Sequence, residues 1–252
     1  GMVAWHRGDN ALTAESLGRV IARHDVDKHK ALYAQFIKEF GVFSHFYAGL
    51  ARTIQGEFDE GRALAEGAIA LSEQLNFPHE RGFALLARFN TALLRDDVET
   101  ADEASHEALT YSIQQGFPEF VAMAQFVQGW CLARRGDIVG GVEQMEDGLN
   151  AWRQTGFTCW QGLFAAIIAP YKVQLGSIAE ATDLVEGYVA QVDATGEEQT
   201  RAPLLLARAV IQRETGQNAA AQHSVAAART AARQQGAVLW QRWIDTQFPD
   251  DE

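Results

Sequence analysis

One turn motif returns every 40 residues along this chain, and that spacing limits the possible folds more than any other feature. The turns begin at Gly56, Asp96, Gly136, Gly176 and Gly216, and they read GEFDEG, DDVETA, GDIVGG, GSIAEA and GQNAAA. A second column stands twenty residues after each of these positions, at Asn76, Gly116, Gly156, Gly196 and Gly236. Five copies in one register indicate an internal repeat.

Each column has a physical reason. Glycine and asparagine tolerate the left-handed conformation that ends many helices, so the second column predicts helix ends. Small residues occur five positions after the turn start, at Gly61, Ala101, Gly141, Ala181 and Ala221. Positions twelve residues after it hold Ala68, Ala108, Gly148, Tyr188 and Ala228. Because seven residues make about two helical turns, both columns share a face that a neighbouring helix can approach closely.

The repeat therefore predicts a helix of about 17 residues, a tight turn and a helix of about 18 residues in each unit. Pro78 and Pro118 fit the first turn of a helix, where the missing N–H matters little. A lone pair cannot bury its apolar face, so we expect an all-α, right-handed solenoid of stacked antiparallel helix pairs. One domain, 1–252, would hold the repeats at about 40–77, 78–117, 118–157, 158–197 and 198–236. An incomplete first pair, 1–39, suggests a piece of a longer polypeptide, and a capping helix is expected at 237–248.

With small residues at these sites, the helical units resemble tetratricopeptide repeats. In that frame Gly49 and Gly129 take the first small site, Gly61 and Ala101 the second, and Ala68 and Ala108 the third. Residues 129–157, GWCLARRGDIVGGVEQMEDGLNAWRQTGF, look like the C-terminal tetratricopeptide region of large bacterial signalling ATPases. Such regions are often fused to adenylate-cyclase or DNA-binding output domains. The resemblance implies a sensor, partner-docking or oligomerisation surface for an NTPase engine located elsewhere. Pro170, inside an expected helix, is predicted to kink it.

Composition limits the possible binding partners and the cellular compartment of the protein. The formal charge of −12 disfavours binding to nucleic acid or to an anionic membrane. Two cysteines, Cys131 and Cys159, make no disulfide framework and fit reduced thiols in a cytosolic protein. The chain contains neither a signal peptide nor an apolar run near the roughly 20 residues that span a bilayer. These features predict a cytoplasmic protein.

Catalytic motifs are absent from the sequence. It has no phosphate-binding glycine loop followed by Lys-Ser/Thr, no nucleophile elbow and no HExxH pair, so we predict no enzyme activity and no cofactor. The stretch RHDVDKHK places His24, Asp25, Asp27 and His29 close together, and a divalent metal is conceivable there. A solvated loop between repeats accounts for the same residues, and we predict no metal site.

The charge pattern is the feature that points to a binding surface. The last fourteen residues of the five first helices contain eight bases and one acid, whereas the second helices with their turns contain nineteen acids and four bases. A groove lined by the first helices could hold an acidic peptide or protein partner, or a second copy of the chain. The candidate contacts are Arg52, Arg88, Gln128, Trp130, Arg134, Lys172 and Arg208.

The same charge pattern is compatible with two alternatives. An anionic metabolite could occupy the groove near Trp130, Arg134 and Lys172. Alternatively, the bases serve no ligand at all: they favour the dipoles of helix ends, and they pair with acids of neighbouring helices. The function predicted first is a non-catalytic interaction or sensor scaffold, in which a ligand changes the curvature of the array.

Overall fold

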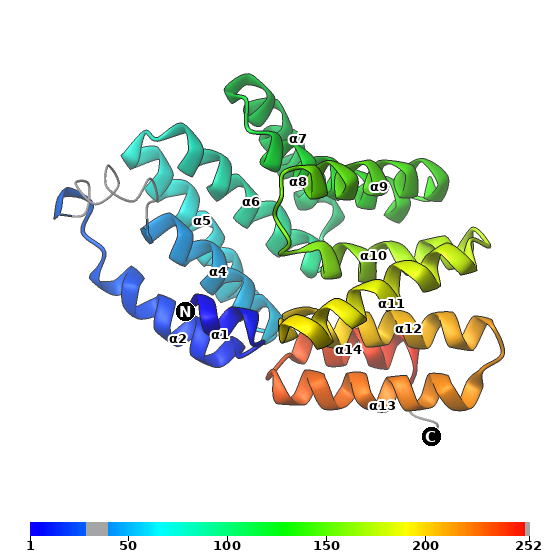
Figure 1. The fold of residues 1–252 in the computed structure, drawn as a ribbon. Coiled ribbons are helices and arrows are strands. Elements are labelled where there is room, and N and C mark those ends of the chain that lie inside the picture. Colours follow the sequence, from blue (N-terminus) through cyan, green and yellow to red (C-terminus); the bar gives the residue numbers. More distant parts are fainter. Residues whose placement is uncertain (29–39, 250–252) are drawn as a thin grey trace.

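The protein is all-helical in the computed structural model, which describes residues 1–28 and 40–249 (Figure 1). It begins with two helices, α1 (Met2–His6) and α2 (Asn10–Arg23). Residues 26–28 are helical as well, so part of the stretch expected to be a loop is not one. His29 lies outside the described residues, and the described part contains no group of three His, Cys, Asp or Glu residues that could hold a metal ion.

Five antiparallel helix pairs follow in chain order. They are α4 (Phe40–Ile54) with α5 (Phe58–Leu75), α6 (Pro78–Leu94) with α7 (Val98–Gln115), α8 (Pro118–Arg134) with α9 (Ile138–Gln154), α10 (Gln161–Gln174) with α11 (Ile178–Thr195), and α12 (Arg201–Glu214) with α13 (Asn218–Gln234). A 3-10 turn, η1 (Glu198–Thr200), precedes α12, and α14 (Val238–Gln247) comes last. None of the described helices is both long enough and apolar enough to cross a membrane.

The second column adopts the left-handed backbone conformation that the sequence predicts. Asn76 has a φ of 51° and Gly116 a φ of 75°, and the three later members of that column are left-handed too. The turn starts are also left-handed, including the one non-glycine member, Asp96, with a φ of 61°. Pro78 and Pro118 begin α6 and α8 as expected. The turn starts and helix ends of the repeat are therefore occupied by residues that accept positive φ.

The last two pairs depart from the predicted boundaries. We expected their first helices near residues 158 and 198, but α10 begins at Gln161 and α12 at Arg201. Trp160 precedes α10 with a φ of 72°, a conformation that a bulky side chain rarely adopts. Both helices have 14 residues, against 17 in α6 and α8.

The small-residue columns let the two helices of a pair approach closely. A Cβ atom on Gly141 would lie 2.6 Å from the backbone nitrogen of Ala133, and one on Gly148 would lie 2.7 Å from that of Phe126. Gly61 is similarly crowded, because its Cβ would meet the Thr53 hydroxyl at 2.2 Å. These contacts explain why the columns hold small residues in these pairs, whereas α11 holds Tyr188 at the second position.

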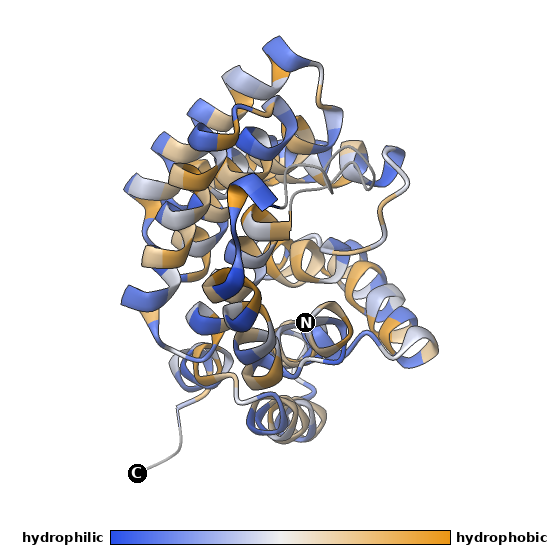
Figure 2. Ribbon diagram, turned by 90° about the vertical axis from the view of Figure 1, so that its left-hand side faces the viewer, coloured by the Kyte–Doolittle hydropathy of each residue, from blue (hydrophilic) through white to orange (hydrophobic). Residues whose placement is uncertain are grey.

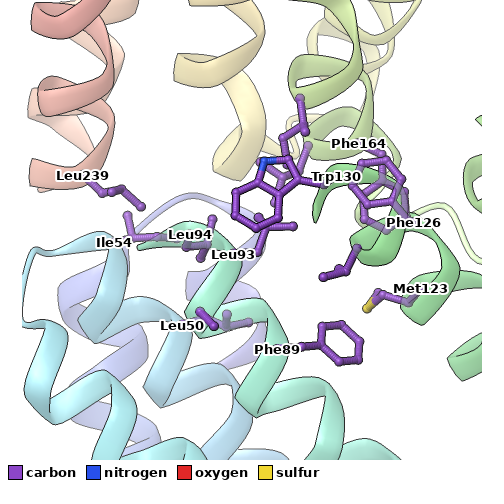
Figure 3. Close-up of a cluster of buried hydrophobic side chains, with 14 of the residues drawn as sticks. Leu50, Ile54, Phe89, Leu93, Leu94, Met123, Phe126, Trp130, Phe164 and Leu239 are labelled. Carbon is purple, nitrogen blue, oxygen red and sulfur yellow. The ribbon is translucent and has the colours of Figure 1, made fainter. Parts of the chain in front are cut away.

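Burial divides the pairs into an inner and an outer layer. Each first helix (α4, α6, α8, α10 and α12) buries between nine and twelve residues, whereas each second helix (α5, α7, α9, α11 and α13) buries five or six. Apolar residues gather toward the middle of the molecule (Figure 2). There, Leu50, Leu94, Phe126, Phe164 and Leu239 form part of one core that joins four first helices and α14 (Figure 3).

The two ends of the array meet. The Asn10 side-chain amide at the start of α2 donates to the Gln235 carbonyl at 2.9 Å, and the Gln199 amide donates to the Asn10 Oδ1 atom at 3.2 Å. The rings of Trp5 in α1 and Trp160 before α10 lie 6.1 Å apart. Because α1 and α2 lie against the C-terminal part of the chain, part of the inner layer faces the protein's own N-terminal segment rather than solvent.

Candidate ligand-binding cleft

Two of the predicted groove cations pair with the outer layer in the same way. An Arg88 guanidinium nitrogen lies 2.6 Å from a Glu66 carboxylate oxygen, and Arg208 makes the equivalent contact with Glu186 at 2.5 Å. In both pairs the glutamate precedes the arginine by 22 residues, so each joins a first helix to the second helix of the preceding pair. These side chains fasten successive pairs together.

Arg52 and Lys172 are also neutralised by acids. Arg52 contacts Glu57 at 2.8 Å and Glu60 at 3.2 Å. Lys172 is 4% exposed, and its ammonium lies 2.5 Å from Glu146 and 2.6 Å from Glu180. Burial alone would lower the pKa of Lys172, but the hydrogen bonds that its ammonium donates to the two carboxylates outweigh burial and raise it.

Gln128 does not join these cations. It is buried in α8, where its carbonyl accepts a hydrogen bond from Gln144 at 3.2 Å. Its amide nitrogen has no partner among the described residues. The seven predicted contacts therefore do not form one open, positive groove, because four cations are paired between the layers and Gln128 lies inside the α8–α9 pair.

Trp130 and Arg134, the remaining two, line a cleft of about 430 Å³. It lies where the C-terminal ends of α6, α8 and α14 meet α10 and α12. Leu93, Ile167 and Leu206 are among its apolar lining residues. Pockets that bind small organic molecules commonly have volumes of about 300–1,000 Å³ and mostly apolar walls, so the cleft has the size and composition of a ligand site.

Trp130 stands apart from the other five tryptophans. Its ring makes neither a hydrogen bond nor a ring contact with any described residue, although it is only 6% exposed. By contrast, the Trp152 indole donates to the Cys159 carbonyl at 2.8 Å, and Trp243 packs edge-on against Trp240. The Trp130 indole lies beside Leu93 at the edge of the core (Figure 3). It is therefore a mostly buried aromatic ring that has no polar or aromatic partner among the described residues and reaches the cleft only at its edge.

The polar end of the cleft holds one charge of each sign. Arg134 lies 2.5 Å from the Asp96 carboxylate, and the two side chains are 41% and 54% exposed. Tyr171 lines the cleft next to them. Burial raises the pKa of its hydroxyl, and the neighbouring Arg134 offsets only part of that rise, so the hydroxyl stays neutral at physiological pH.

Proline shapes the floor of the cleft. Pro170 lies inside α10 and has no N–H to donate to the carbonyl of Ala166, four residues earlier, and both residues line the cleft. Pro203, in the first turn of α12, lines it too. The sequence predicts a kink at Pro170 but does not place this residue in a binding site.

Sequence reasoning missed Trp243, Tyr171 and the two prolines as cleft residues. Trp243 belongs to the capping helix, which was expected only to cover the apolar edge of the last repeat. No local pattern could have found the cleft, because its walls come from five helices spread over more than 150 residues of sequence. The unusual feature visible beforehand was Trp130 beside Gln128 and Arg134 in one helix.

A second hollow lies beside the first turn of α14. This cavity of about 50 Å³ is lined by Trp5, Trp160 and Trp240, and by Gln199 of η1. The Trp240 indole nitrogen and the Gln199 side-chain oxygen are buried without a hydrogen-bond partner among the described residues. Residues from both ends of the chain enclose this cavity.

Comparison with known proteins gives one distant likeness and no family. No family model matches the chain. It is 23% identical over 184 residues to an uncharacterized protein of Rhizobium meliloti (strain 1021). The match covers 71% of this chain but only 18% of that relative, so the chain spans less than a fifth of the relative's length.

Proposed function

We propose that the chain is a non-catalytic sensor scaffold that binds a small molecule in the cleft beside Trp130. In this proposal the helix pairs form a right-handed solenoid of the tetratricopeptide type, and the ligand ties together the ends of its inner helices. The observation that carries the proposal is the cleft itself: about 430 Å³, mostly apolar, with an unpartnered tryptophan and a single charge pair. A ligand that contacts five helices would alter how they stack.

The small-molecule hypothesis has more support than an acidic peptide along the inner layer. Peptide binding would require Arg52, Arg88, Lys172 and Arg208 to leave their carboxylate partners. A buried cation such as Lys172 would also leave two glutamates unpaired. The cleft needs no such exchange over most of its surface, because its walls are apolar.

A place within a larger regulatory protein is part of the proposal. The relative is more than five times as long as the segment it shares with this chain. The stretch at 129–157 resembles the C-terminal region of bacterial signalling ATPases. We infer that ligand binding here biases an output domain of a larger protein, and that protein partners or a second copy of the chain contact the outer faces.

Thermal stability and tryptophan emission test the proposal together. The protein is screened with three ligand sets: small apolar acids, nucleotides and acidic peptides. A cleft ligand at about 100 times its Kd should stabilise the fold by about 2.7 kcal/mol, which raises Tm by about 5–10 °C in a chain of this size. It should also shift tryptophan emission.

Two matched variants locate the site. Trp130→Phe combined with Trp243→Phe should abolish most of the emission change, because both indoles line the cleft. Trp152→Phe should keep it, because Trp152 does not line the cleft and its indole is already bonded to the Cys159 carbonyl. The proposal fails if only acidic peptides stabilise the protein, or if the emission change survives when both cleft tryptophans are replaced.

A further inference from the structure

The geometry points to a ligand class: a flat, apolar carboxylate, whose rings lie against Trp130 and Trp243 and whose carboxylate binds Arg134. This inference rests on the proposed function, because it assumes that the cleft is the binding site. It adds the shape and the charge of the ligand. Three features of the cleft carry it: its hydrogen-bonding balance, its aromatic walls and its replaceable ion pair.

Among the described polar side chains that line the cleft, three can only donate (Trp130, Trp243 and Arg134) and one can only accept (Asp96), while Tyr171, Gln174, Thr246 and Gln247 can do both. An indole nitrogen can only donate, and neither Trp130 nor Trp243 has a hydrogen-bond partner among the described residues. Arg134 brings further N–H groups, and only one of its nitrogens is in contact with Asp96. Asp96, the one carboxylate among the described lining residues, is already engaged by Arg134. A ligand that supplies acceptors complements this set better than one that supplies donors.

The walls suit a planar, apolar body. Trp243, Tyr171 and Pro170 are half-buried in the lining and present flat or rigid surfaces, while Trp130 and Pro203 are buried behind them. Flat rings on the ligand can stack on such surfaces at little entropic cost. The apolar residues Ile167 and Leu206 exclude water around that body.

The Arg134–Asp96 pair is open to exchange. Both side chains are largely exposed, so their mutual attraction is weak and screened. A ligand carboxylate can replace Asp96 on the guanidinium with a two-point contact, and Asp96 then turns to solvent. Lys172 takes no part, because it does not line the cleft and is held by Glu146 and Glu180.

A cationic ligand is the competing chemistry. Aromatic rings beside an acid can also hold an ammonium group, and Asp96 would then be the anchor. The two chemistries make opposite predictions for Asp96. Removing its charge frees Arg134 for an anion but removes the anchor of a cation.

The test uses three probes that share one ring system and differ in charge: 2-naphthoate, 2-naphthalenemethanol and 2-naphthylmethylammonium. Isothermal titration with the full chain should rank naphthoate first, with an affinity about tenfold or more above the alcohol and the ammonium compound. Tryptophan quenching by the same probes reports contact with the aromatic walls.

Three variants then assign the charge. Arg134→Gln should weaken naphthoate binding about tenfold and leave the alcohol unchanged. Asp96→Asn should strengthen naphthoate binding several-fold, and asparagine tolerates the φ of 61° at this position, so the turn is kept. Arg208→Gln is the matched control: it also removes an arginine paired with a carboxylate, but outside the cleft, and should leave naphthoate binding unchanged.

The outcomes separate the two proposals. If no probe of any charge binds or quenches tryptophan, the cleft is not the site and the proposed function fails. If the ammonium compound or the alcohol binds as tightly as naphthoate, or if Asp96→Asn weakens naphthoate binding, the carboxylate class is overturned while the cleft remains a ligand site.

Discussion

Two hollows lie along α14, and the same helix supplies a tryptophan to each. Trp240 lines the small cavity, Trp243 lines the large cleft, and their rings are 4.9 Å apart. Trp240 is 2% exposed, whereas Trp243 is half-buried. One helical turn thus separates two positions with different environments.

The difference comes from how the chain ends meet. Residues from α1 and η1 help to enclose the cavity of about 50 Å³, while no described residue of the N-terminal segment lines the cleft of about 430 Å³. Closure of the array therefore decides which part of α14 is a structural junction and which part can receive a ligand. Residue type alone would not distinguish the two tryptophans.

The largest expected effect comes from truncating the two tryptophans in parallel. Trp240→Ala empties a fully packed site and should lower the free energy of unfolding by about 3–5 kcal/mol. Trp243→Ala, at the edge of the open cleft, should lower it by about 1–2 kcal/mol. Urea denaturation measures both. Equal losses would mean that Trp240 and Trp243 are packed equally well, which would contradict the difference between the cavity and the cleft.

The next effect concerns the contact that closes the array. Asn10→Ala removes a donor to the Gln235 carbonyl and an acceptor for the Gln199 amide, and leaves both groups buried. We expect a loss of about 2–3 kcal/mol. Hydrogen exchange should quicken in α1 and α2 but not in α8.

Asn218 supplies the control for the closing contact. It is the exposed first residue of α13, so Asn218→Ala should change stability by no more than about 0.5 kcal/mol. If Asn10→Ala accelerates exchange evenly along the whole chain, the closure is part of one cooperative unit and not a separate junction.

The sequence predicts the local features of the fold but not the contacts that close the array. The pairs, their turns and the left-handed positions follow from local spacing, because each repeat carries its own punctuation. The closing hydrogen bond joins Asn10 to Gln235 across 225 positions, and neither residue belongs to a repeated column. Nothing in the periodic pattern of the chain distinguishes an array that stays open from one whose ends meet.

The charge pattern is visible in the sequence, but the partner of each charged side chain is not. Basic first helices and acidic second helices suggest a groove for an acidic ligand when each layer is considered alone. In the structure, Arg88 meets Glu66 and Arg208 meets Glu186 at the same sequence separation. That shared spacing of 22 residues was present in the sequence and could have indicated pairing between layers. The contribution of Trp243 to the cleft could not be foreseen, since it depends on how α14 packs across the inner helices.

The smallest expected effect concerns the alkylation rates of the two cysteines, whose surroundings differ. Burial raises the pKa of the Cys131 thiol to about 12, so at pH 8 its reactive thiolate is only about 1 part in 10,000. Cys159 is half-buried and lines the enclosed cavity. Iodoacetamide should therefore alkylate Cys159 at least about 100-fold faster than Cys131, as followed by mass spectrometry of the two peptides.

Raising the pH toward 12 should increase Cys131 alkylation steadily, because its thiolate fraction grows about tenfold for each pH unit below that pKa. Asn10→Ala should raise the rate at Cys159 and leave the rate at Cys131 unchanged, since only the cavity depends on the closing contact. A variant that accelerates both cysteines equally would show that loss of the closing contact also loosens α8, and the closing contact would not be a separate junction.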